Sequence, residues 1–304
     1  MRFGIDLGGT KVEIVGLKAD GEVALRERTQ TPAGDYRQTV QTLVDLVLAA
    51  EKTLGVQGTV GIGIPGSLSL ATGMVRNANS TALNGFPLKQ DLELGLQREV
   101  RLANDANCFA LSEAADGAAA GSNNVFGVIF GTGCGGGVVI NGQIVEGING
   151  IGGEWGHNPL PAPRDDERPG PNCYCGRAGC TEAWLSGPSF ARSYQRAGGE
   201  KILPREVMTR VRAGEALANQ CFDDYIDRAA RALASIMNVL DPEIIVLGGG
   251  MSNVDELYDR IPKVWGPHVF SDRIDTRLVK NKHGDSSGVR GAAWLWPLES
   301  SVGQ

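Results

Sequence analysis

Several features that would place this 304-residue chain in a broad class are missing from it. No run of apolar residues approaches the roughly 20 that a membrane-spanning helix needs. The N-terminal segment MRFGIDLGGT lacks the pattern of a signal peptide and is typical of a buried strand, so we expect a cytoplasmic protein. The net charge of −6 offers no excess of basic residues, which argues against a nucleic-acid partner.

Histidine is scarce as well, with only three in the chain, and His157 shortly precedes a group of closely spaced cysteines. Without export, a disulfide framework is not expected. Zinc prefers cysteine and histidine, and a closed structural site takes four protein ligands. Three ligands are at hand: Cys173, Cys175 and Cys180. A fourth is needed, and His157 is the nearest histidine. The other cysteines stand alone and fit buried thiols: Cys108, Cys134 and Cys221.

The first part of the chain predicts a strand meander, a helix and one more strand. The strands are expected at residues 2–7, 11–17, 22–29 and 59–66. A Gly-Gly-Thr loop makes the first corner, and the last strand runs into Pro-Gly. Asp35 can cap a helix that ends at Gly55. Its apolar positions follow helical spacing: Val40, Leu43, Val44, Val47 and Leu48.

The same pattern restarts later in the chain. Its parts are a strand into a Gly-rich turn at 125–137, a hairpin at Asn141-Gly142, a helix at 223–238 and a strand at 244–250. FGIDLGGT (3–10) and FGVIFGTG (126–133) resemble each other, as do VGIGIPG (60–66) and IVLGGG (245–250). We infer a duplicated α/β domain whose two Gly-rich turns face one cleft. Chance similarity of Gly-rich strand ends is the alternative.

Three glycine-rich turns predict phosphate binding: DLGGTK (6–11), GTGCGGG (131–137) and GGGMSN (248–253). Glycines let backbone N–H groups approach an anion without Cβ atoms in the way. Hairpin turns also collect glycine, so one such turn alone would be weak evidence. Neither of the first two turns matches a P-loop or a Rossmann fingerprint. Asp6 is either a turn cap or an outer ligand, through water, of the Mg²⁺ that accompanies ATP.

A candidate base follows the strand EVRLA (99–103), in the segment Asn-Asp-Ala-Asn (104–107). A carboxylate at a strand end, flanked by amides, is well placed to accept a proton. Phosphoryl transfer needs such a group near the attacking hydroxyl, together with positioning and charge neutralisation. An Asx turn is the alternative interpretation of this segment.

Together these motifs resemble the ROK family of sugar kinases, repressors and open reading frames. They occur in the family's order and span essentially the whole chain: DLGGTK (6–11), LANDAN (102–107), GTGCGGG (131–137), GEWGH (153–157), CYCGRAGCTE (173–182) and LGGGMSN (247–253). Within the family, three segments look most similar to the bacterial manno(fructo)kinases: NANSTALNG (77–85), LANDANC (102–108) and HGDSSGVRGAAWLWP (283–297).

The resemblance implies a duplicated, actin-like (ribonuclease-H-like) ATPase fold of two lobes. The smaller lobe would comprise residues 1–117 and the C-terminal helix, about 289–304. The larger lobe would comprise 118–288 and contain the zinc motif. The family also suggests a homodimer.

The resemblance further implies the role of each motif residue. Asp105 would be the catalytic base. The sugar-binding residues would be Gly66, Asn79, Asn104, Asp105, Glu154, His157 and Glu182. The ATP-binding residues would be Asp6, Gly8, Gly9, Thr10, Lys11, Thr132, Gly133, Cys134, Gly135, Gly249 and Gly250. A structural zinc would be bound by His157, Cys173, Cys175 and Cys180. Zinc on one nitrogen of His157 would leave the other nitrogen for a sugar hydroxyl.

We therefore expect an Mg-ATP-dependent hexose kinase that phosphorylates the 6-hydroxyl of fructose, with mannose as a secondary substrate. A kinase for N-acetylglucosamine or glucose is the alternative within the family. A family repressor would need a helix-turn-helix, for which the phosphate loop at residue 6 leaves no room. A non-catalytic sugar-binding or zinc-binding scaffold is a further alternative, and the cysteine spacing does not fit a zinc finger.

One segment departs from the family pattern. PAPRDDERPGPN (161–172) separates His157 from the cysteines and is longer than in typical ROK glucokinases. Its prolines and charges predict a surface loop. A lid edge, a dimer contact and no specific role all remain open for it.

Overall fold

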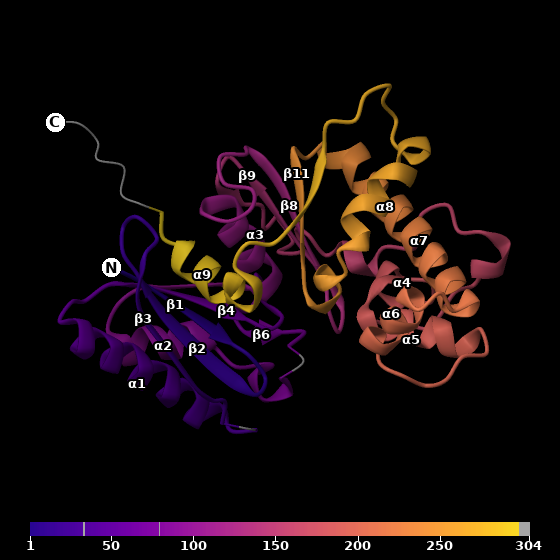
Figure 1. Ribbon diagram of the computed structural model, residues 1–304. Helices are drawn as coiled ribbons and strands as arrows, with labels where there is room; N and C mark the ends of the chain where they lie inside the picture. The colour runs from indigo at the N-terminus through magenta and orange to yellow at the C-terminus, as the bar shows by residue number, and fades with distance from the viewer. Residues whose placement is uncertain (33, 79, 298–304) are drawn as a thin grey trace. The chain divides into compact units, whose positions relative to one another are not determined.

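The computed structural model describes residues 1–32, 34–78 and 80–297 (Figure 1). All six cysteines lie in this part of the chain, and none forms a disulfide. None of the helices described is both long and apolar enough to cross a membrane. The chain divides into two compact units. The first contains residues 1–121, 142–152 and the described part of 285–304, and the second contains 122–141 and 153–284.

The sequence places the unit boundaries after residues 117 and 288, whereas the structure places them after 121 and 284. The structure also returns residues 142–152 to the first unit, a feature that the linear pattern does not predict.

The first unit is a twisted sheet with helices on both faces. Its elements are β1 (Arg2–Leu7), β2 (Lys11–Leu17), β3 (Val23–Gln30), α1 (Tyr36–Leu54), β4 (Thr59–Ile64), β5 (Ser67–Leu68), β6 (Val75–Arg76), α2 (Leu88–Leu96), β7 (Val100–Asn104), α3 (Asp105–Ala115), β10 (Gln143–Ile144) and α9 (Ser287–Trp294). The main sheet has the order β3-β2-β1-β4-β7. Strands β1, β4 and β7 run parallel, and β2 is antiparallel to both of its neighbours.

Helix α1 begins and ends where its local sequence predicts. The Asp35 side chain accepts a hydrogen bond from the N–H of Gln38, and Gly55 ends the helix with a left-handed φ of 65°. Three of the predicted apolar positions are buried: Leu43, Val44 and Val47. Leu48 was also expected on this stripe, but 49% of its surface is exposed. The apolar stripe is therefore narrower than predicted, because Leu48 lies at its solvent edge.

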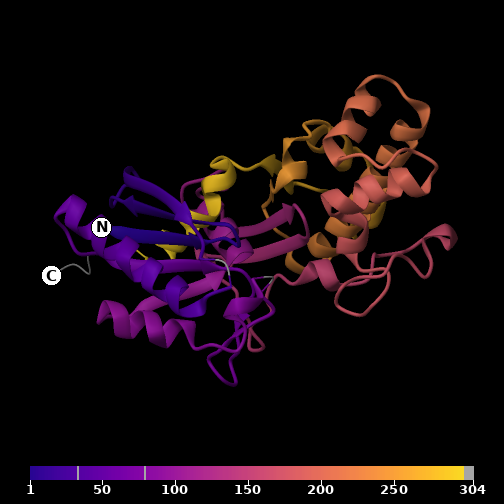
Figure 2. The ribbon, with the colours of Figure 1, turned by 90° about the horizontal axis from the view of Figure 1, so that it is seen from below.

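Strand β1 separates two different packing layers. Its large apolar side chains join a core with α1 and α2: Phe3, Ile5 and Leu7. On the opposite face, α9 lies against β1 and β4 (Figures 1 and 2). There the strands carry Gly4 and Gly61, and a methyl group on either would overlap a backbone carbonyl oxygen of α9. Glycine is thus required because helix and strand backbones meet directly.

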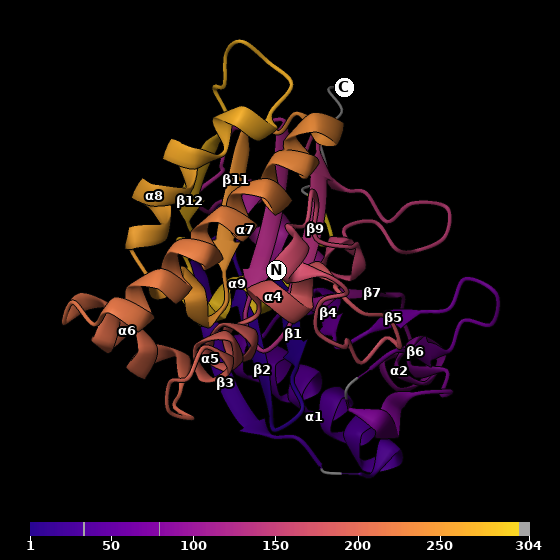
Figure 3. The same ribbon diagram turned by 90° about the vertical axis from the view of Figure 1, so that its right-hand side faces the viewer.

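The second unit places a sheet beside a group of helices. Its elements are β8 (Asn124–Phe130), β9 (Cys134–Ile140), α4 (Thr181–Leu185), α5 (Gly187–Arg196), α6 (Pro204–Arg212), α7 (Ala216–Leu240), β11 (Ile244–Gly248), α8 (Glu256–Val264) and β12 (Arg277–Lys280). Helix α7 extends well beyond the predicted 223–238 and packs beside α8, as Figure 3 shows. Its buried side chains share one core with Phe126, Val128 and Phe130 of β8.

The two sheets repeat one strand plan. In the first unit the plan is β2-β1-β4-β7, and in the second it is β9-β8-β11-β12. In both, an antiparallel hairpin is followed by two parallel strands. This confirms the predicted duplication. The Gly-rich turn predicted within 125–137 is shorter than expected, because Cys134 already begins the returning strand β9.

The packing of α9 leads to a test of the first unit. Substitution Gly61→Ala should lower the free energy of unfolding by roughly 2–3 kcal/mol, because the methyl group overlaps the Ala292 carbonyl and forces the backbones apart. Urea denaturation would measure the change. Gly266→Ala is the matched control, since no atom lies within 4 Å of the added methyl group. Equal stability of both variants would contradict the close backbone packing.

Candidate active site and metal cluster

The carboxyl ends of the three parallel strands in the first sheet carry the predicted catalytic residues. Asp6 lies in β1 opposite Gly63 of β4, and Ile64 of β4 lies opposite Asn104 of β7. In open α/β sheets, ligands bind beyond these ends of the strands. Asp6, Gly66 and the Asn104-Asp105 pair, which are distant in sequence, therefore gather at one edge of the first sheet.

Asp105 is the first residue of α3, and Asn104 caps that helix. The Asn104 Oδ1 accepts a hydrogen bond of 2.8 Å from the N–H of Ala106, and its Nδ2 donates to the carbonyl of Gly66 at 3.0 Å. The Asp105 Oδ1 also accepts from the Ala106 N–H, at 2.8 Å. The Asx-turn interpretation of the sequence therefore applies to Asn104, and this turn positions Asp105 next to it. Asn104 keeps one N–H for a ligand.

Asp6 is held in an electrostatically unfavourable position. Burial, the largest influence, and the negative charges of Asp105 and Glu13 together raise its pKa to about 6, against the opposing effect of Lys11 and Arg28. A cation beside Asp6 would relieve both the desolvation of the carboxylate and its repulsion from Asp105. The surroundings of Asp6 therefore fit the predicted Mg²⁺, which usually keeps several waters and contacts few carboxylates.

The glycine turn at 6–11 uses part of its backbone for its own structure. The N–H of Gly8 donates to the carbonyl of Lys11 at 3.0 Å, and the Gly8 carbonyl accepts from Thr31 Oγ1 at 2.7 Å. Gly8 therefore serves the turn itself. Gly9 and Thr10 are exposed and line a cavity of about 390 Å³, so they are the parts of this turn placed to contact a ligand.

The turn at 131–135 also departs from its expected role. The Gly131 N–H donates to the Gly133 carbonyl at 3.0 Å. The Cys134 N–H donates to Glu182 Oε2 at 2.9 Å, and the Cys134 side chain is buried. The Cys134 amide, predicted to bind phosphate, is therefore already engaged. Gly135 belongs to strand β9, which leaves exposed Thr132 and half-buried Gly133 at the tip of the turn.

The third glycine turn packs directly on the second. Gly249 has a φ of 78°, and a methyl group there would lie 2.6 Å from the Phe130 carbonyl and 2.8 Å from the Gly131 nitrogen. Gly250, by contrast, has open space around its Cα and begins a short 3-10 turn, Gly250–Asn253. Gly249 is therefore structural, and Gly250 is accessible to a ligand.

A cavity of about 520 Å³ opens beside these two turns within the second unit. Thr132 and Gly250 line it together with an apolar group: Pro188, Leu203, Pro204, Met208, Met251 and Val254. Arg205 and Arg212 add positive charge at its wall. A pocket with apolar walls, backbone N–H groups and guanidinium groups can hold a planar base and its phosphates.

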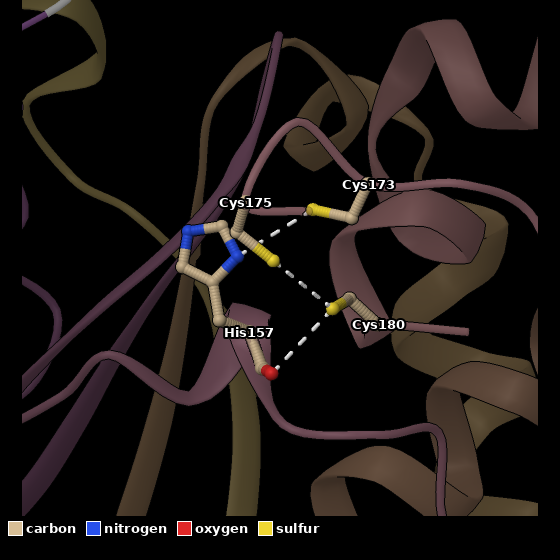
Figure 4. A group of neighbouring side chains, drawn as sticks. All are labelled: His157, Cys173, Cys175 and Cys180. Carbon is tan, nitrogen blue, oxygen red and sulfur yellow. Dashed lines mark hydrogen bonds between the residues drawn. The ribbon is translucent and has the colours of Figure 1, made fainter. Parts of the chain in front are cut away.

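The predicted metal ligands converge within the second unit (Figure 4). One ligand atom from each of the four residues, His157, Cys173, Cys175 and Cys180, lies within 4.8 Å of all the others. His157 Nδ1 is 3.6 Å from Cys173 Sγ, and Cys175 Sγ is 3.6 Å from Cys180 Sγ. Tetrahedral zinc would place its sulfur and nitrogen ligands about 3.6–3.8 Å apart.

The chemistry of the cluster also suits zinc. Hydrogen bonds from the Arg177 backbone and side chain lower the pKa of the Cys175 thiol to about 6. The thiolate is the form that binds metal. Burial raises the pKa of the Cys173 thiol and raises that of Cys180 to about 12, and a bound cation would offset this effect. Four protein ligands close a tetrahedral shell, which leaves no position for water or substrate. The set therefore fits a structural metal and not a Lewis acid.

The second ring nitrogen of His157 is engaged, in contrast to its expected availability. His157 Nε2 lies 3.0 Å from the Tyr174 hydroxyl, and the two rings meet edge to face. A sugar hydroxyl can reach this nitrogen only if Tyr174 moves. Glu154 is exposed, whereas Glu182 is fixed by the Cys134 N–H. The structure brings Glu182 to the cluster, with its Oε1 3.9 Å from Cys173 Sγ.

The long segment at 161–172 is anchored by one buried carboxylate. Glu167 is 2% exposed and forms ion pairs with Arg228 at 2.7 Å and with Arg231 at 2.8 Å. Arg231 also donates to the carbonyls of Pro161 and Ala162. Both arginines belong to α7, so the described contacts tie this loop to the second unit's core.

Burial, the largest influence, raises the pKa of Glu167. The Arg164 backbone N–H and the guanidinium groups of Arg231 and Arg228 outweigh it and lower the pKa to about 2. No sequence signal distinguished Glu167 from its acidic neighbours, since only the fold places α7 beside it. The apolar residues that line the cavity beside Thr132 and Gly250 were not predicted either, because in the sequence they resemble core residues. The predicted sugar-binding Asn79 lies outside the described residues.

Comparison with known proteins places this arrangement among sugar kinases. The ROK family profile matches residues 2–299. An N-acetyl-D-glucosamine kinase from Pectobacterium carotovorum is 42% identical over 304 residues, covering 99% of this chain and 100% of the relative. The ROK hexokinase structure from Thermus thermophilus has a TM-score of 0.87 and 30% identity, with 96% of each chain covered.

A second solved structure shares the fold at lower identity. It is a ROK family glucokinase from Streptomyces griseus in complex with glucose and AMPPNP, with a TM-score of 0.76 and 27% identity. The match covers 97% of this chain and 98% of that one. The expected actin-like ATPase fold of two lobes is confirmed by these neighbours. The expected grouping with manno(fructo)kinases is not supported, since the 42%-identical relative is an N-acetyl-D-glucosamine kinase.

The Glu167 anchor can be tested by changing its charge. Glu167→Gln should lower the free energy of unfolding at pH 7 by roughly 3–5 kcal/mol, because two buried guanidinium groups lose their counter-charge. The folded-state pKa lies below the ordinary 4.5, so the carboxylate stabilises the wild type above pH 4.5. That contribution is lost as the pH falls from 4.5 towards 2, and the two proteins should converge.

Urea titrations from pH 7 to pH 3 would follow this convergence. Asp165→Asn is the matched control, because Asp165 lies in the same loop with a fully exposed carboxylate. A constant stability difference between the wild type and Glu167→Gln over this range would contradict the assigned role.

Proposed function

This chain belongs to the ROK family and is a sugar kinase, and we propose that it transfers the γ-phosphate of ATP to the 6-hydroxyl of a hexose, with Asp105 as base. The observation that carries the proposal is the Asn104-Asp105 pair at the carboxyl end of β7. Asn104 bonds both the α3 backbone and the Gly66 carbonyl, so the carboxylate beside it has a fixed position. A fixed carboxylate is the one protein group that must approach the attacking hydroxyl.

The chemical step follows from this placement. Asp105 accepts the proton of the acceptor hydroxyl while its oxygen forms a bond to the γ-phosphorus. The bond from that phosphorus to the β,γ-bridging oxygen breaks, and ADP leaves with the electron pair. Positioning and charge neutralisation supply most of the rate, because the transition state is largely dissociative.

Each unit, taken by itself, has residues that could contact the nucleotide. Thr132, Gly133 and Gly250 would offer backbone N–H groups to phosphates, and the cavity of about 520 Å³ would hold the base. Gly9 and Thr10 would contribute the exposed tip of the first turn. Asp6 would hold Mg²⁺ through water. That ion, when bound with ATP, neutralises charge on the phosphates.

Two acceptors have support. N-acetyl-D-glucosamine is favoured by the relative of 42% identity, whose match spans 99% of this chain. Fructose is favoured by the segments NANSTALNG, LANDANC and HGDSSGVRGAAWLWP, which resemble the manno(fructo)kinases. We propose N-acetyl-D-glucosamine as the preferred acceptor, because the similarity that supports it extends over almost the whole chain. For either sugar, Glu154 and Glu182 would accept hydrogen bonds from ring hydroxyls.

Zinc would hold the acceptor region together. His157, Cys173, Cys175 and Cys180 fit a closed tetrahedral shell, and Glu182 lies two residues beyond the last cysteine. Bound zinc would stabilise the loop that carries Glu182 and Tyr174. The role of zinc there would be structural and not catalytic.

Turnover against a sugar panel tests the proposed reaction. ADP release with Mg-ATP should be measured for N-acetyl-D-glucosamine, fructose, mannose and glucose, and kcat/KM compared. Preference for N-acetyl-D-glucosamine supports the first acceptor, and preference for fructose supports the second. Asp105→Asn should lower kcat by roughly 10²–10⁴-fold, because the amide cannot accept the proton.

Asp45→Asn, at an exposed position of α1, is the control for that substitution and should keep full activity. Turnover of Asp105→Asn at the wild-type rate would exclude Asp105 as the base. Lack of turnover by the wild type with all four sugars would contradict the proposed hexose acceptor.

Loss of one cysteine should remove the metal. We expect about one zinc per wild-type chain by mass spectrometry of metals and almost none in Cys175→Ser, because three ligands hold zinc much more weakly. Sugar affinity should fall together with the zinc content. Cys221→Ser is the control, since Cys221 is a buried thiol outside the cluster and should leave zinc bound. Full zinc content in Cys175→Ser would rule out this ligand set.

A further inference from the structure

The Asn84 side chain forms two hydrogen bonds with the backbone of one residue, Ala78, within the first unit. Its Nδ2 donates to the Ala78 carbonyl at 2.9 Å, and its Oδ1 accepts from the Ala78 N–H, also at 2.9 Å. Ala78 is 5% exposed, so its backbone groups are shielded from water and need such partners. One side-chain amide thus takes the place that a neighbouring strand normally holds.

The course of the chain after β6 explains why a side chain is needed here. Val75 of β6 exchanges backbone hydrogen bonds of 3.0 Å and 2.8 Å with residues 85–86. Asn77 then adopts a left-handed φ of 57°, which interrupts the extended strand. Backbone pairing therefore stops before Asn77, and the Asn84 amide resumes it at Ala78.

The conformation of Asn77 is one that its surroundings must impose. L-residues seldom adopt a positive φ, although asparagine does so at less cost than most. Asn77 is held between the Asn84–Ala78 pair on one side and, on the other, Arg76, which pairs with Ser67 of β5. Such conformations persist where neighbouring contacts over-determine them. Loss of the Asn84 amide should therefore release this segment.

Gly66 packs directly on the segment that Asn84 fixes. A methyl group on Gly66 would lie 2.6 Å from the Ala78 nitrogen and would also overlap the Arg76 carbonyl. The Gly66 carbonyl in turn accepts a hydrogen bond from Asn104 Nδ2 at 3.0 Å. The fixed segment is therefore one contact away from Gly66 and Asn104, which are both proposed to bind the sugar.

The loop closed by the Asn84–Ala78 pair has a second neighbour. Residues 80–83 line the cavity of about 390 Å³ together with Gly9 of the first glycine turn. A methyl group on Gly9 would lie 3.2 Å from the Ser80 hydroxyl oxygen. An effect of Asn84 confined to ATP would therefore mean that the pair serves the phosphate side and not the acceptor side.

We propose that Asn84 is a positioning residue for the acceptor sugar, because its side-chain amide fixes the backbone on which Gly66 rests. This inference rests on the proposed function and deepens it. Asn84 acts through Gly66 and Asn104 and does not touch the reacting atoms. The affinity for the sugar, and the choice between sugars, then depend on a side chain behind the site.

The test uses Asn84→Ala in the full-length protein. The KM for the preferred sugar, and its Kd by calorimetric titration, should rise roughly tenfold, because the Ala78 backbone loses both partners and the segment under Gly66 is released. By contrast, kcat and the KM for ATP should stay within about twofold of the wild type, because the contacts of α3 and of the first glycine turn remain. Ratios of kcat/KM between the four sugars should also narrow, since a released segment discriminates less.

Asn238→Ala is the matched control. Asn238 Nδ2 donates to the His268 carbonyl at 2.9 Å, and its Oδ1 accepts from the Phe270 N–H at 2.8 Å, so it bonds a backbone in the same way within the other unit. This variant should leave the sugar Kd unchanged. Urea denaturation would verify that both variants are folded.

Asn84→Asp provides a second variant if Asn84→Ala does not fold. It keeps an acceptor for the Ala78 N–H and loses only the donor to the Ala78 carbonyl, so it too should raise the sugar Kd. An unchanged sugar Kd in the folded variant would overturn the role of Asn84. A fall in kcat alone, a rise in the KM for ATP alone, or an equal rise of the sugar Kd in Asn238→Ala would overturn it as well.

The two proposals fail in different ways. Normal turnover by the wild type, with an unchanged sugar Kd in the Asn84 variants, overturns the role of Asn84 and leaves the kinase reaction intact. Sugar binding by the wild type without turnover contradicts the reaction, while the Kd of the variants still tests Asn84. Binding of none of the sugars overturns both.

Discussion

The direct contact between the backbone of α9 and its neighbours is the constraint on which the candidate catalytic edge of the first unit depends. Gly4 and Gly61 let α9 lie on the sheet, and Gly291 lets it lie on α3, where a methyl group would overlap the Cys108 carbonyl. The Ser287 hydroxyl also donates to the buried Glu113 of α3 at 2.7 Å. Because α3 begins at Asp105, these contacts hold the proposed base through packed backbone and not through a flexible side chain.

The second unit depends on a different link, the hydrogen bond from the Cys134 N–H to Glu182. It joins the turn at 131–135 to the segment that carries the cysteines. A methyl group on Gly133 would lie 2.5 Å from Glu182 Oε2, so the glycine also makes room for the carboxylate. One carboxylate thus joins the turn that we propose to bind phosphate to the loop that we propose to bind the acceptor. Such a shared contact couples the positions of the two segments, which favours preorganised geometry.

The sequence predicted those features that have local causes. The Asp35 cap, the Asn141-Gly142 hairpin and the grouping of cysteines follow from neighbours along the chain. Features created by distant contacts were not predicted. Whether an amide such as that of Cys134 is free depends on Glu182, and the burial of Glu167 depends on α7. Leu48 was wrongly predicted to lie on the buried stripe, because helical spacing identifies the apolar face of a helix but not how much of that face other elements cover.

Acceptor choice is decided by few groups, which explains why two acceptors both find support. The proposed base and the proposed sugar-binding carboxylates could serve any hexose, because a 6-hydroxyl and ring hydroxyls occur in all of them. Strong discrimination arises where a buried polar group is left unpaired by the wrong sugar. Glu182, which is half-buried and held by the Cys134 N–H, comes nearer to that requirement than exposed Glu154, which can turn towards water. The identity of 42% is an average over the whole chain. It therefore gives no special weight to the few residues that would contact the sugar.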